Sequence, residues 1–348
     1  MLINQHTPCL IIAEIGLNHN GDYELAKKSI IAAAKAGVDA VKFQNFLTED
    51  FLSDRSILHT YKVGNKEIIE PLFDICKRSE FKVEWLSDLI DICNELGVIF
   101  ISTPTSESGV NDLIANEVKY IKNGSDYLSH LPLLKYMAST DATIIISTGM
   151  AYQEEIDDAV NEILLARPDK SKLIILHCTS SYPTSPENIN LSKIKTLQER
   201  YQVSVGFSDH TEGWESAVQA VTLGAKVVEK HFTLNKKLPG PDHWFSSNPK
   251  EFQELVFQIR LAEKRMGFGE LKPANSEMKD RKQWRLGLFW DQNMQAGDTI
   301  FKKDVAIRKP ATNLLPKDLD SIIGQKIIRS CKKGEPVTKS NYSEGTYE

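Results

Sequence analysis

Eight short apolar runs, each followed by a longer segment of helical period, occupy most of the chain. The intervening segments, such as residues 23–37 and 83–97, carry apolar residues at positions i, i+3, i+4 and i+7 and close on a glycine. Eight strand–helix repeats over this length predict a closed (β/α)8 barrel, the TIM-barrel architecture. A doubly wound open sheet is the alternative, but no G-x-G-x-x-G motif follows the first run. The expected strands are residues 10–15, 40–44, 98–103, 118–123, 143–148, 173–178, 203–208 and 226–231.

The chain changes character after residue 266. Residues 268–281 are polar and contain glycine and proline, as a linker does, and short strand-like runs with turns follow to the C-terminus. We therefore expect a barrel at residues 1–267, a linker at 268–281 and a small β-rich domain at 282–348. Within the barrel, residues 47–83 form a connection too long for a simple turn, and we expect an extra helix at 67–79.

The composition excludes several classes of protein. Apolar residues make up 41% of the chain, which is enough for a sizeable core. The net charge of −5 argues against a nucleic-acid binder that neutralises phosphates. Five scattered cysteines without a C-x-x-C pair indicate a reduced, cytoplasmic protein. The N-terminal apolar run has no basic region before it and is interrupted by Glu14, so we expect neither a signal peptide nor a membrane span.

Polar side chains stand at the end of every expected strand, where barrels carry their functional groups. One such residue is often only a cap for the next helix, but lysines and hydroxyls gathered on one rim have no capping role in common. Lys42 and Lys122 with the neighbouring hydroxyls therefore predict a site for a phosphate or carboxylate. The candidates are Glu14, Lys42, Gln44, Ser102, Thr103, Lys122, Ser125, Ser147, Thr148, His177, Thr179, Ser208, Asp209, His210, Lys230 and His231.

His210 and His231 are one strand–helix repeat apart, which places them side by side on neighbouring strands. Paired neutral imidazoles with a nearby carboxylate can bind a divalent cation, whereas a hydrogen-bonded core histidine is the ordinary alternative for either residue alone. The matched placement favours a metal site. His177 is a weaker third candidate with an equally good structural explanation, and Lys230 should face the other side of the sheet.

The loop 238–246 follows the last expected strand and contains glycine and prolines that stiffen it. It should present Asp242 and His243 over the barrel mouth. Asp242 could bind sugar hydroxyls or support a metal ligand, and an Asx-turn is the structural alternative.

Eight motifs of the chain resemble those of the sialic acid synthase family, the enzymes that make nonulosonic acids. The resemblance runs from about residue 10 to 333, and the order of H-N-G-D, S-D-H-T, K-H-F-T and G-P-D-H is highly specific. The tail resembles the antifreeze-like (SAF) domain of these synthases. The motifs are AEIGLNHNGD (13–22), VKFQ (41–44), FISTP (100–104), STGM (147–150), LHCTSSYPT (176–184), GFSDHT (206–211), EKHFT (229–233) and PGPDH (239–243).

The resemblance implies a condensation of phosphoenolpyruvate with the open-chain aldehyde of an N-acylated hexosamine, with release of phosphate. By position, it implies that Glu14 orients or deprotonates water or a sugar hydroxyl, that His210 and His231 bind the metal, and that Tyr182 and Asp242 contact the sugar. Glu14, His231 and Asp242 thus form the catalytic set. The substrate-binding set is Lys42, Gln44, Thr103, Lys122, Ser125, Ser147, Ser180, Tyr182, Arg308 and Lys309.

The resemblance also implies a divalent metal, with Mn2+ in first place and Mg2+ or Co2+ as alternatives. It implies a homodimer in which the SAF domain of one chain covers the barrel mouth of the other. In the SAF domain the usual K-R-P-G reads R-K-P-A, so Lys309, with Arg308 beside it, stands where an arginine reaches the partner's sugar. Lysine cannot make the bidentate fork of arginine.

Three further departures concern the site in the barrel. Asp126 and Tyr127 follow Ser125, where the family has a small residue and then a carboxylate near the metal. Ser180 stands where asparagine is common. Trp244 and Phe245 follow the G-P-D-H motif in place of Lys-Ala, which suggests a less hydroxylated or more acylated acceptor such as a 2,4-diacetamido-2,4,6-trideoxyhexose, with an N-acetylmannosamine-like sugar as the other expectation.

Two other functions compete with this synthase activity. The first is another phosphoenolpyruvate aldol-type enzyme that makes a 3-deoxy-ulosonate from a phosphorylated aldose, but the strand ends offer no second basic pocket for the extra phosphate. The second is a non-catalytic carbohydrate-binding protein. Binding alone does not require a site that combines lysines, a carboxylate and paired histidines, so we favour the synthase.

Overall fold

The computed structural model describes residues 7–267 and 269–343. The chain divides into two compact units, Met1–Gly267 and Phe268–Glu348, and each is described by itself. No helix within the described residues is both long and apolar enough to cross a membrane.

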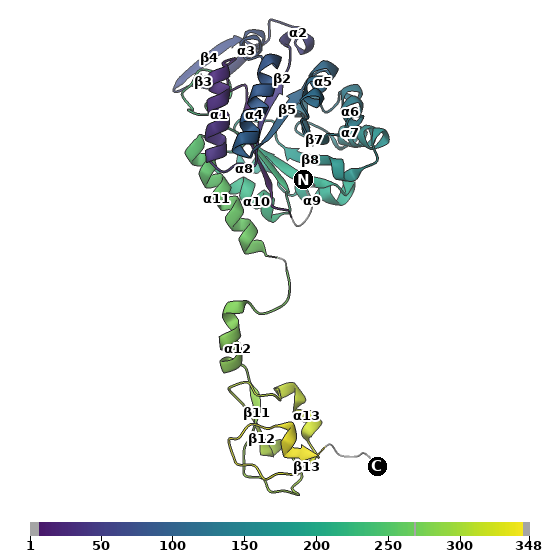
Figure 1. The fold of residues 1–348 in the computed structure, drawn as a ribbon, viewed down its shortest axis with the longest axis vertical. Coiled ribbons are helices and arrows are strands. Elements are labelled where there is room, and N and C mark those ends of the chain that lie inside the picture. Colours follow the sequence, from purple (N-terminus) through teal and green to yellow (C-terminus); the bar gives the residue numbers. More distant parts are fainter. Residues whose placement is uncertain (1–6, 268, 344–348) are drawn as a thin grey trace. The chain divides into compact units, whose positions relative to one another are not determined.

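The first unit is a closed parallel barrel in which all eight predicted strands form (Figure 1). The strands neighbour one another in the order β1-β10-β9-β8-β7-β6-β5-β2, and β2 pairs with β1 to complete the closure. The predicted TIM-type fold is therefore confirmed. The strands are β1 Leu10–Gly16, β2 Ala40–Asn45, β5 Ile99–Pro104, β6 Tyr120–Asn123, β7 Thr143–Ser147, β8 Leu173–Cys178, β9 Ser204–Asp209 and β10 Val227–His231.

Helices surround the strands and follow local signals in the sequence (Figure 1). Asp22 accepts a hydrogen bond from the Leu25 amide and caps α1, and Gly97, with φ of 70°, ends α4. Asn248 and Glu251 form a capping box at the start of α11. The helices are α1 Tyr23–Lys35, α4 Leu86–Leu96, α5 Glu107–Ala115, α6 Leu131–Ala138, α7 Gln153–Ala166, α8 Pro186–Ile189, α9 Lys193–Tyr201, α10 Glu215–Thr222 and α11 Pro249–Met266, with 3-10 turns η1 Val83–Trp85, η2 Ser125–Tyr127 and η3 Lys170–Lys172.

Strand alternation sorts the apolar side chains into two layers. One buried cluster, which includes Ile12, Ile101 and Leu176, fills the barrel interior, and a larger one, which includes Ile11 and Phe43, packs between strands and helices. Two positions further along each strand, towards its carboxyl end, the side chains that face the barrel interior are polar. The pattern that builds the core therefore also decides which strand-end side chains face the barrel mouth.

The long connection after β2 differs from its prediction. It contains α2 (Thr48–Phe51) and an antiparallel hairpin of β3 (Leu58–Val63) and β4 (Lys66–Pro71) before α3 (Leu72–Arg78). The helix predicted at 67–79 is thus wrong in its first half. Inside such a helix Pro71 would clash with a preceding carbonyl, and Gly64, with φ of 59°, makes the hairpin turn.

The second unit contains two small antiparallel sheets around its own core. Trp290 is fully buried there, together with Leu288, Ile300 and Ile322. Helix α12 (Met278–Trp284) begins within the range predicted as linker, so that segment is not without secondary structure. The other elements are η4 Asn275–Glu277, β11 Gly287–Trp290, η5 Lys302–Asp304, β12 Val305–Arg308, η6 Pro316–Asp318, α13 Leu319–Ile322, β13 Lys326–Ile327, η7 Lys339–Asn341 and β14 Tyr342–Ser343.

Candidate functional site

The strand register gathers the predicted site residues at the carboxyl ends of the strands. In the parallel ladders, Glu14 on β1 lies opposite Lys42 on β2 and opposite His231 on β10. These residues share the inward parity of the interior apolar cluster. The inward side chains at this end are Glu14, Lys42, Gln44, Thr103, Lys122, Ser147, Cys178, Ser208, His210, Glu229 and His231.

Lys42 is the centre of a buried charge cluster. Its Nζ lies 3.0 Å from Oε2 of Glu14 and 3.5 Å from Oε1 of Glu229, and it donates a hydrogen bond to Thr103 at 3.2 Å. Burial lowers the pKa of Lys42, but the two carboxylates outweigh it and raise that pKa overall. Gln44 donates to Oε1 of Glu14 at 2.8 Å, so the carboxylate of Glu14 is held from two sides.

Glu229 was not among the residues that the sequence analysis selected. Its side chain is buried beside Lys42, and Ser208 Oγ lies 3.4 Å from its Oε1. The attraction of Lys42 and Lys122 outweighs burial, which would raise the pKa of Glu229, and lowers it overall. A signal for it was available, because Glu229 has the same strand parity as His231.

Lys122 is a buried cation held by neutral groups. Its Nζ donates to Ser147 Oγ at 2.6 Å and to the carbonyl of Asn123 at 2.8 Å. The side chain is 1% exposed, and burial lowers the pKa of the Lys122 amine. Within the described part of the chain, Lys122 forms no ion pair with a carboxylate. A buried ammonium without a carboxylate partner is a suitable group to bind an anion.

Two hydroxyls converge above Gly149, next to this lysine site. Ser125 Oγ accepts a hydrogen bond from the Gly149 amide at 3.0 Å. A Cβ atom placed on Gly149 would lie 2.3 Å from Ser180 Oγ and 2.7 Å from Ser125 Oγ. The Ser125 and Ser180 hydroxyls thus lie close together, and both have room because Gly149 has no side chain.

His210 and His231 lie next to each other, with ring centroids 5.5 Å apart. Nδ1 of His210 is 2.8 Å from the Thr179 carbonyl, which can only accept, so Nδ1 carries the proton and Nε2 is left free to bind a metal when the ring is neutral. Burial by itself would lower the pKa of His210, but contact with the Cys178 thiol outweighs burial, so this pKa is raised overall. Cys178, 3.8 Å from Nδ1, is a second inward residue that the sequence analysis missed.

His231 is held neutral, because burial lowers its pKa well below the usual value. Its Nδ1 is buried without a hydrogen bond, and Oδ2 of Asp242 lies 3.6 Å away. An imidazole pair in which the His231 ring is neutral and has an unpartnered buried nitrogen fits the donor set of a divalent transition metal. Among the described residues no group of three or more His, Cys, Asp or Glu side chains is arranged to hold a metal, so the protein offers two imidazoles and no third close ligand.

Aromatic rings cover the two histidines. The Tyr182 ring centroid lies 4.1 Å from that of His210, and Phe245 lies 5.1 Å from His231 and 5.0 Å from Tyr182. Asp242, on the same loop as Phe245, lies beside His231 as predicted, whereas His243 of that loop is fully buried against the Thr233 hydroxyl and is not presented over the mouth. Burial, helped by the charge of Glu14, raises the pKa of Asp242 to about 7.

Several strand-end candidates do not have the inward parity, namely Ser102, Thr148, His177, Thr179, Asp209 and Lys230. His177 lies 2.6 Å from the Ile189 carbonyl and stacks on Phe207, so its structural alternative is the right one. Lys230 pairs with Asp209 at 2.9 Å, which confirms that it faces away from the mouth. Asp126 is exposed, and the ring of Tyr127 stacks on His130.

Arg308 and Lys309 lie in the second unit. Arg308 forms an ion pair with Asp291, and the ammonium of Lys309 lies 4.8 Å from the centroid of the Trp284 ring. Both are exposed residues of that unit. Their predicted role toward the sugar stays a prediction.

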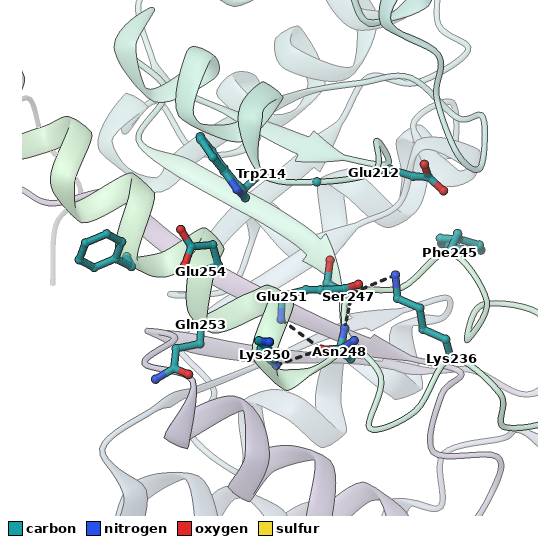
Figure 2. A pocket seen from close by; sticks show the side chains of 12 residues that line it. Glu212, Trp214, Lys236, Phe245, Ser247, Asn248, Lys250, Glu251, Gln253 and Glu254 are labelled. Carbon is teal, nitrogen blue, oxygen red and sulfur yellow. Dashed lines mark hydrogen bonds and ion pairs between the residues drawn. The ribbon is translucent and has the colours of Figure 1, made fainter.

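A cavity of about 990 Å3 is lined by Phe245, whose ring packs against His231; Figure 2 shows the side chains that line it. Its walls come from the β9–α10 loop with Glu212 and Trp214, the β10–α11 loop with Lys236 and Phe245, and the first turns of α11. Lys236 pairs with Glu251 at 2.9 Å. The lysines and histidines of the barrel mouth do not line this cavity, and Phe245 belongs to both regions.

Both units of the chain match known protein families. Residues 29–271 match the model of the NeuB family, and residues 287–342 match that of the SAF domain. The chain is 37% identical to N,N'-diacetyllegionaminic acid synthase of Legionella pneumophila, over 94% of this chain and 92% of that protein. It is 31% identical to a pseudaminic acid synthase of Campylobacter jejuni, over 97% and 98%.

Among solved structures, the chain is similar to N-acetylneuraminic acid synthetase from Leptospira borgpetersenii in complex with citrate. The identity is 34%, the TM-score is 0.70, and the match covers 79% of this chain and 90% of that one. The sequence matches, the closed eight-stranded barrel and the small C-terminal sheets agree with one another. The chain therefore belongs to the NeuB family and carries a C-terminal SAF domain.

Proposed function

We propose that this protein is a nonulosonic acid synthase that condenses phosphoenolpyruvate with the aldehyde of an N-acylated amino sugar and releases phosphate. One observation carries the proposal: a lysine–hydroxyl site for an anion and a pair of adjacent histidines lie in the same barrel mouth, beside the buried Glu14–Lys42 pair. The relatives named above are synthases of such acids.

The anion site suits phosphoenolpyruvate. Lys122 and Lys42 provide charge from neighbouring parts of the mouth, and hydroxyls provide directed hydrogen bonds. We assign the phosphate to the side of Ser125, Ser147 and Ser180, because those hydroxyls gather around Gly149 and Lys122. The carboxylate is then left for Lys42 and Thr103.

The histidine pair would hold a divalent metal, with Mn2+ first and Mg2+ or Co2+ as alternatives. When bound, such an ion supplies positive charge that polarises an aldehyde oxygen. His210 and His231 are the protein ligands, and the Thr179 carbonyl keeps the proton of His210 on Nδ1. The rings of Tyr182 and Phe245 pack against these two histidines.

The chemistry that the chain must support forms one carbon–carbon bond. C3 of phosphoenolpyruvate attacks the aldehyde carbon, water adds at C2, and the resulting tetrahedral centre expels inorganic phosphate. Glu14, held by Lys42 and Gln44, is placed to accept a proton from the water. Asp242, whose pKa is raised to about 7, can exchange a proton with the sugar near neutral pH.

For the acceptor we favour a 2,4-diacetamido-2,4,6-trideoxyhexose over N-acetylmannosamine. Tyr182 and Phe245 offer apolar surface beside the histidines, which suits a methyl group and acetyl groups better than hydroxyls. The 37% identical relative is named for a diacetylated product. We further propose a homodimer in which Arg308 or Lys309 of a second chain reaches the acceptor.

The deciding experiment measures phosphate release from phosphoenolpyruvate with Mn2+. The acceptors are 2,4-diacetamido-2,4,6-trideoxyhexoses, N-acetylmannosamine and its 6-phosphate. We expect the trideoxy sugars to give the highest kcat/KM. Release should fall at least about 100-fold after chelation and return with Mn2+, because the aldehyde loses its polarising charge. The proposal is contradicted if no phosphate is released with any of these acceptors, or if a chelator leaves the release unchanged.

Replacing Gly149 by alanine should damage the phosphate end of the site. The added methyl would overlap Ser180 Oγ and Ser125 Oγ, so both hydroxyls must turn away. Gly149 does not have a left-handed φ, so the effect is steric and not a backbone strain. We expect the KM for phosphoenolpyruvate to rise roughly 10- to 100-fold, as for other small displacements of substrate-positioning groups. An unchanged KM for phosphoenolpyruvate would remove these serines from the phosphate site.

A further inference from the structure

The loop that carries Phe245 is tied down on both sides of that residue. On one side Asn20 donates to the Pro239 carbonyl at 2.8 Å, and the Thr233 hydroxyl lies 2.6 Å from Nδ1 of His243. On the other side Asn18 donates to Ser246 Oγ at 2.9 Å. The backbone around Phe245 is therefore held by hydrogen bonds, and the position of its ring is set by side-chain packing.

The two neighbouring aromatic rings of this loop have different partners. Phe245 packs against Tyr182 and His231, inside the candidate site. Trp244 packs against Lys62 of the β3–β4 hairpin, whose ammonium lies 5.2 Å from the centroid of the Trp244 ring. Of Trp244 and Phe245, Phe245 is therefore the one that contacts His231 and Tyr182.

Phe245 also lines the cavity of about 990 Å3 next to the site (Figure 2). Its ring thus has the His231 and Tyr182 rings as neighbours within the site, and it also borders the cavity. The cavity extends from there toward Trp214 and the first turns of α11. Phe245 thus lies between the rings of the candidate site and the cavity that it lines.

The chemistry of the acceptor connects this residue to specificity. In a 2-acylamido sugar aldehyde, the carbon that carries the acylamido group is bonded directly to the carbonyl carbon. If the aldehyde oxygen lies at the histidine pair, the acyl group must lie within a few bonds of it. The apolar surfaces there belong to Tyr182 and Phe245.

We propose that Phe245 is the specificity-determining residue that limits the length of one N-acyl group of the acceptor, the one on the carbon bonded to the aldehyde carbon. This inference rests on the proposed synthase function. The ring packs against an acetyl methyl group and blocks a longer chain, which would otherwise continue into the cavity. Phe245 touches the acceptor only, so phosphoenolpyruvate binding should not depend on it.

The test compares acceptors in which the N-acyl group next to the aldehyde is acetyl, propanoyl, butanoyl or pentanoyl. Both the trideoxy sugar and mannosamine are used. In the wild type we expect kcat/KM to fall roughly 10-fold or more for each added methylene. In Phe245→Ala the pentanoyl acceptor should improve at least about 10-fold, and the acetyl acceptor should lose about as much. The KM for phosphoenolpyruvate should stay within about twofold, because no anion-binding group is altered.

Two variants guard the interpretation. Phe245→Val keeps part of the side chain and should give an intermediate acyl profile even if the alanine variant folds poorly. Phe257→Ala is the matched control, because Phe257 lines the same cavity from α11 and no contact of its ring with either histidine occurs among the described residues. Its acyl profile should equal that of the wild type.

The outcomes separate the inference from the function on which it rests. A wild type that releases no phosphate with any acceptor overturns both. An active wild type with the same acyl profile in all variants overturns only the role of Phe245. A change in Phe257→Ala that equals the change in Phe245→Ala assigns the effect to the cavity in general and also overturns it.

Discussion

His231→Ala is expected to reduce Mn2+-dependent phosphate release roughly 1,000-fold or more. The variant removes one of two imidazoles from a site where the described residues offer no third close ligand, so metal affinity should fall sharply. Mn2+ binding measured by calorimetry or by electron paramagnetic resonance gives a readout that does not depend on turnover. We expect binding to weaken by at least about 100-fold, because loss of a direct ligand should cost no less than loss of a group that only orients one.

His177→Ala is the matched control for this loss. His177 is also a buried histidine at a strand end, but it belongs to the outer layer and bonds the Ile189 carbonyl. The control should lower the melting temperature while Mn2+ affinity stays near that of the wild type. If His231→Ala binds Mn2+ normally and turns over, the histidine pair is a core feature and the metal site lies elsewhere.

Lys42→Met should impair both catalysis and stability. Removal of the ammonium leaves Glu14 and Glu229 buried without their partner, which costs about 3–5 kcal/mol in comparable buried pairs. It also removes a charge from the anion site, so kcat/KM for phosphoenolpyruvate should fall roughly 100-fold or more. Steady-state kinetics and denaturant unfolding measure the two effects separately.

Lys230→Met is the control that separates these effects. Lys230 is an equally buried lysine with a carboxylate partner, Asp209, but it faces away from the barrel mouth. It should lose stability to a similar degree and keep the KM for phosphoenolpyruvate. Adding Glu229→Gln to Lys42→Met should recover part of the stability and none of the activity. A Lys230 variant that loses substrate affinity to the same degree would mean that Lys42 acts through folding alone.

Much of the site could be predicted because the barrel converts sequence position into spatial position. Strands of period two that end in Lys42, Lys122, His210 and His231 must present those side chains at one rim once the barrel closes. The same parity rule would have found Glu229, two residues before His231. The last residues of each strand do not include Glu229, which lies two positions before the end of β10.

Other features could not be read from local patterns. Strand β4 falls within the range predicted as a helix, because isoleucines at 68 and 69 fit either period and only Pro71 opposes a helix there. The meeting of Ser125 and Ser180 over Gly149 joins loops after different strands. No spacing along the chain encodes such a distance.

The sequence by itself determined the barrel, its eight strands and the identity of most groups that face its mouth, because hydrophobic periodicity and strand-end chemistry are local properties. The tertiary structure decided which of those groups touch. It set Lys42 between Glu14 and Glu229, and it turned Phe245 toward His231 and Trp244 toward Lys62. The reason is physical: ion pairs and ring contacts act over a few ångströms, and only closure of the barrel and the packing of its loops bring residues from distant segments within that range.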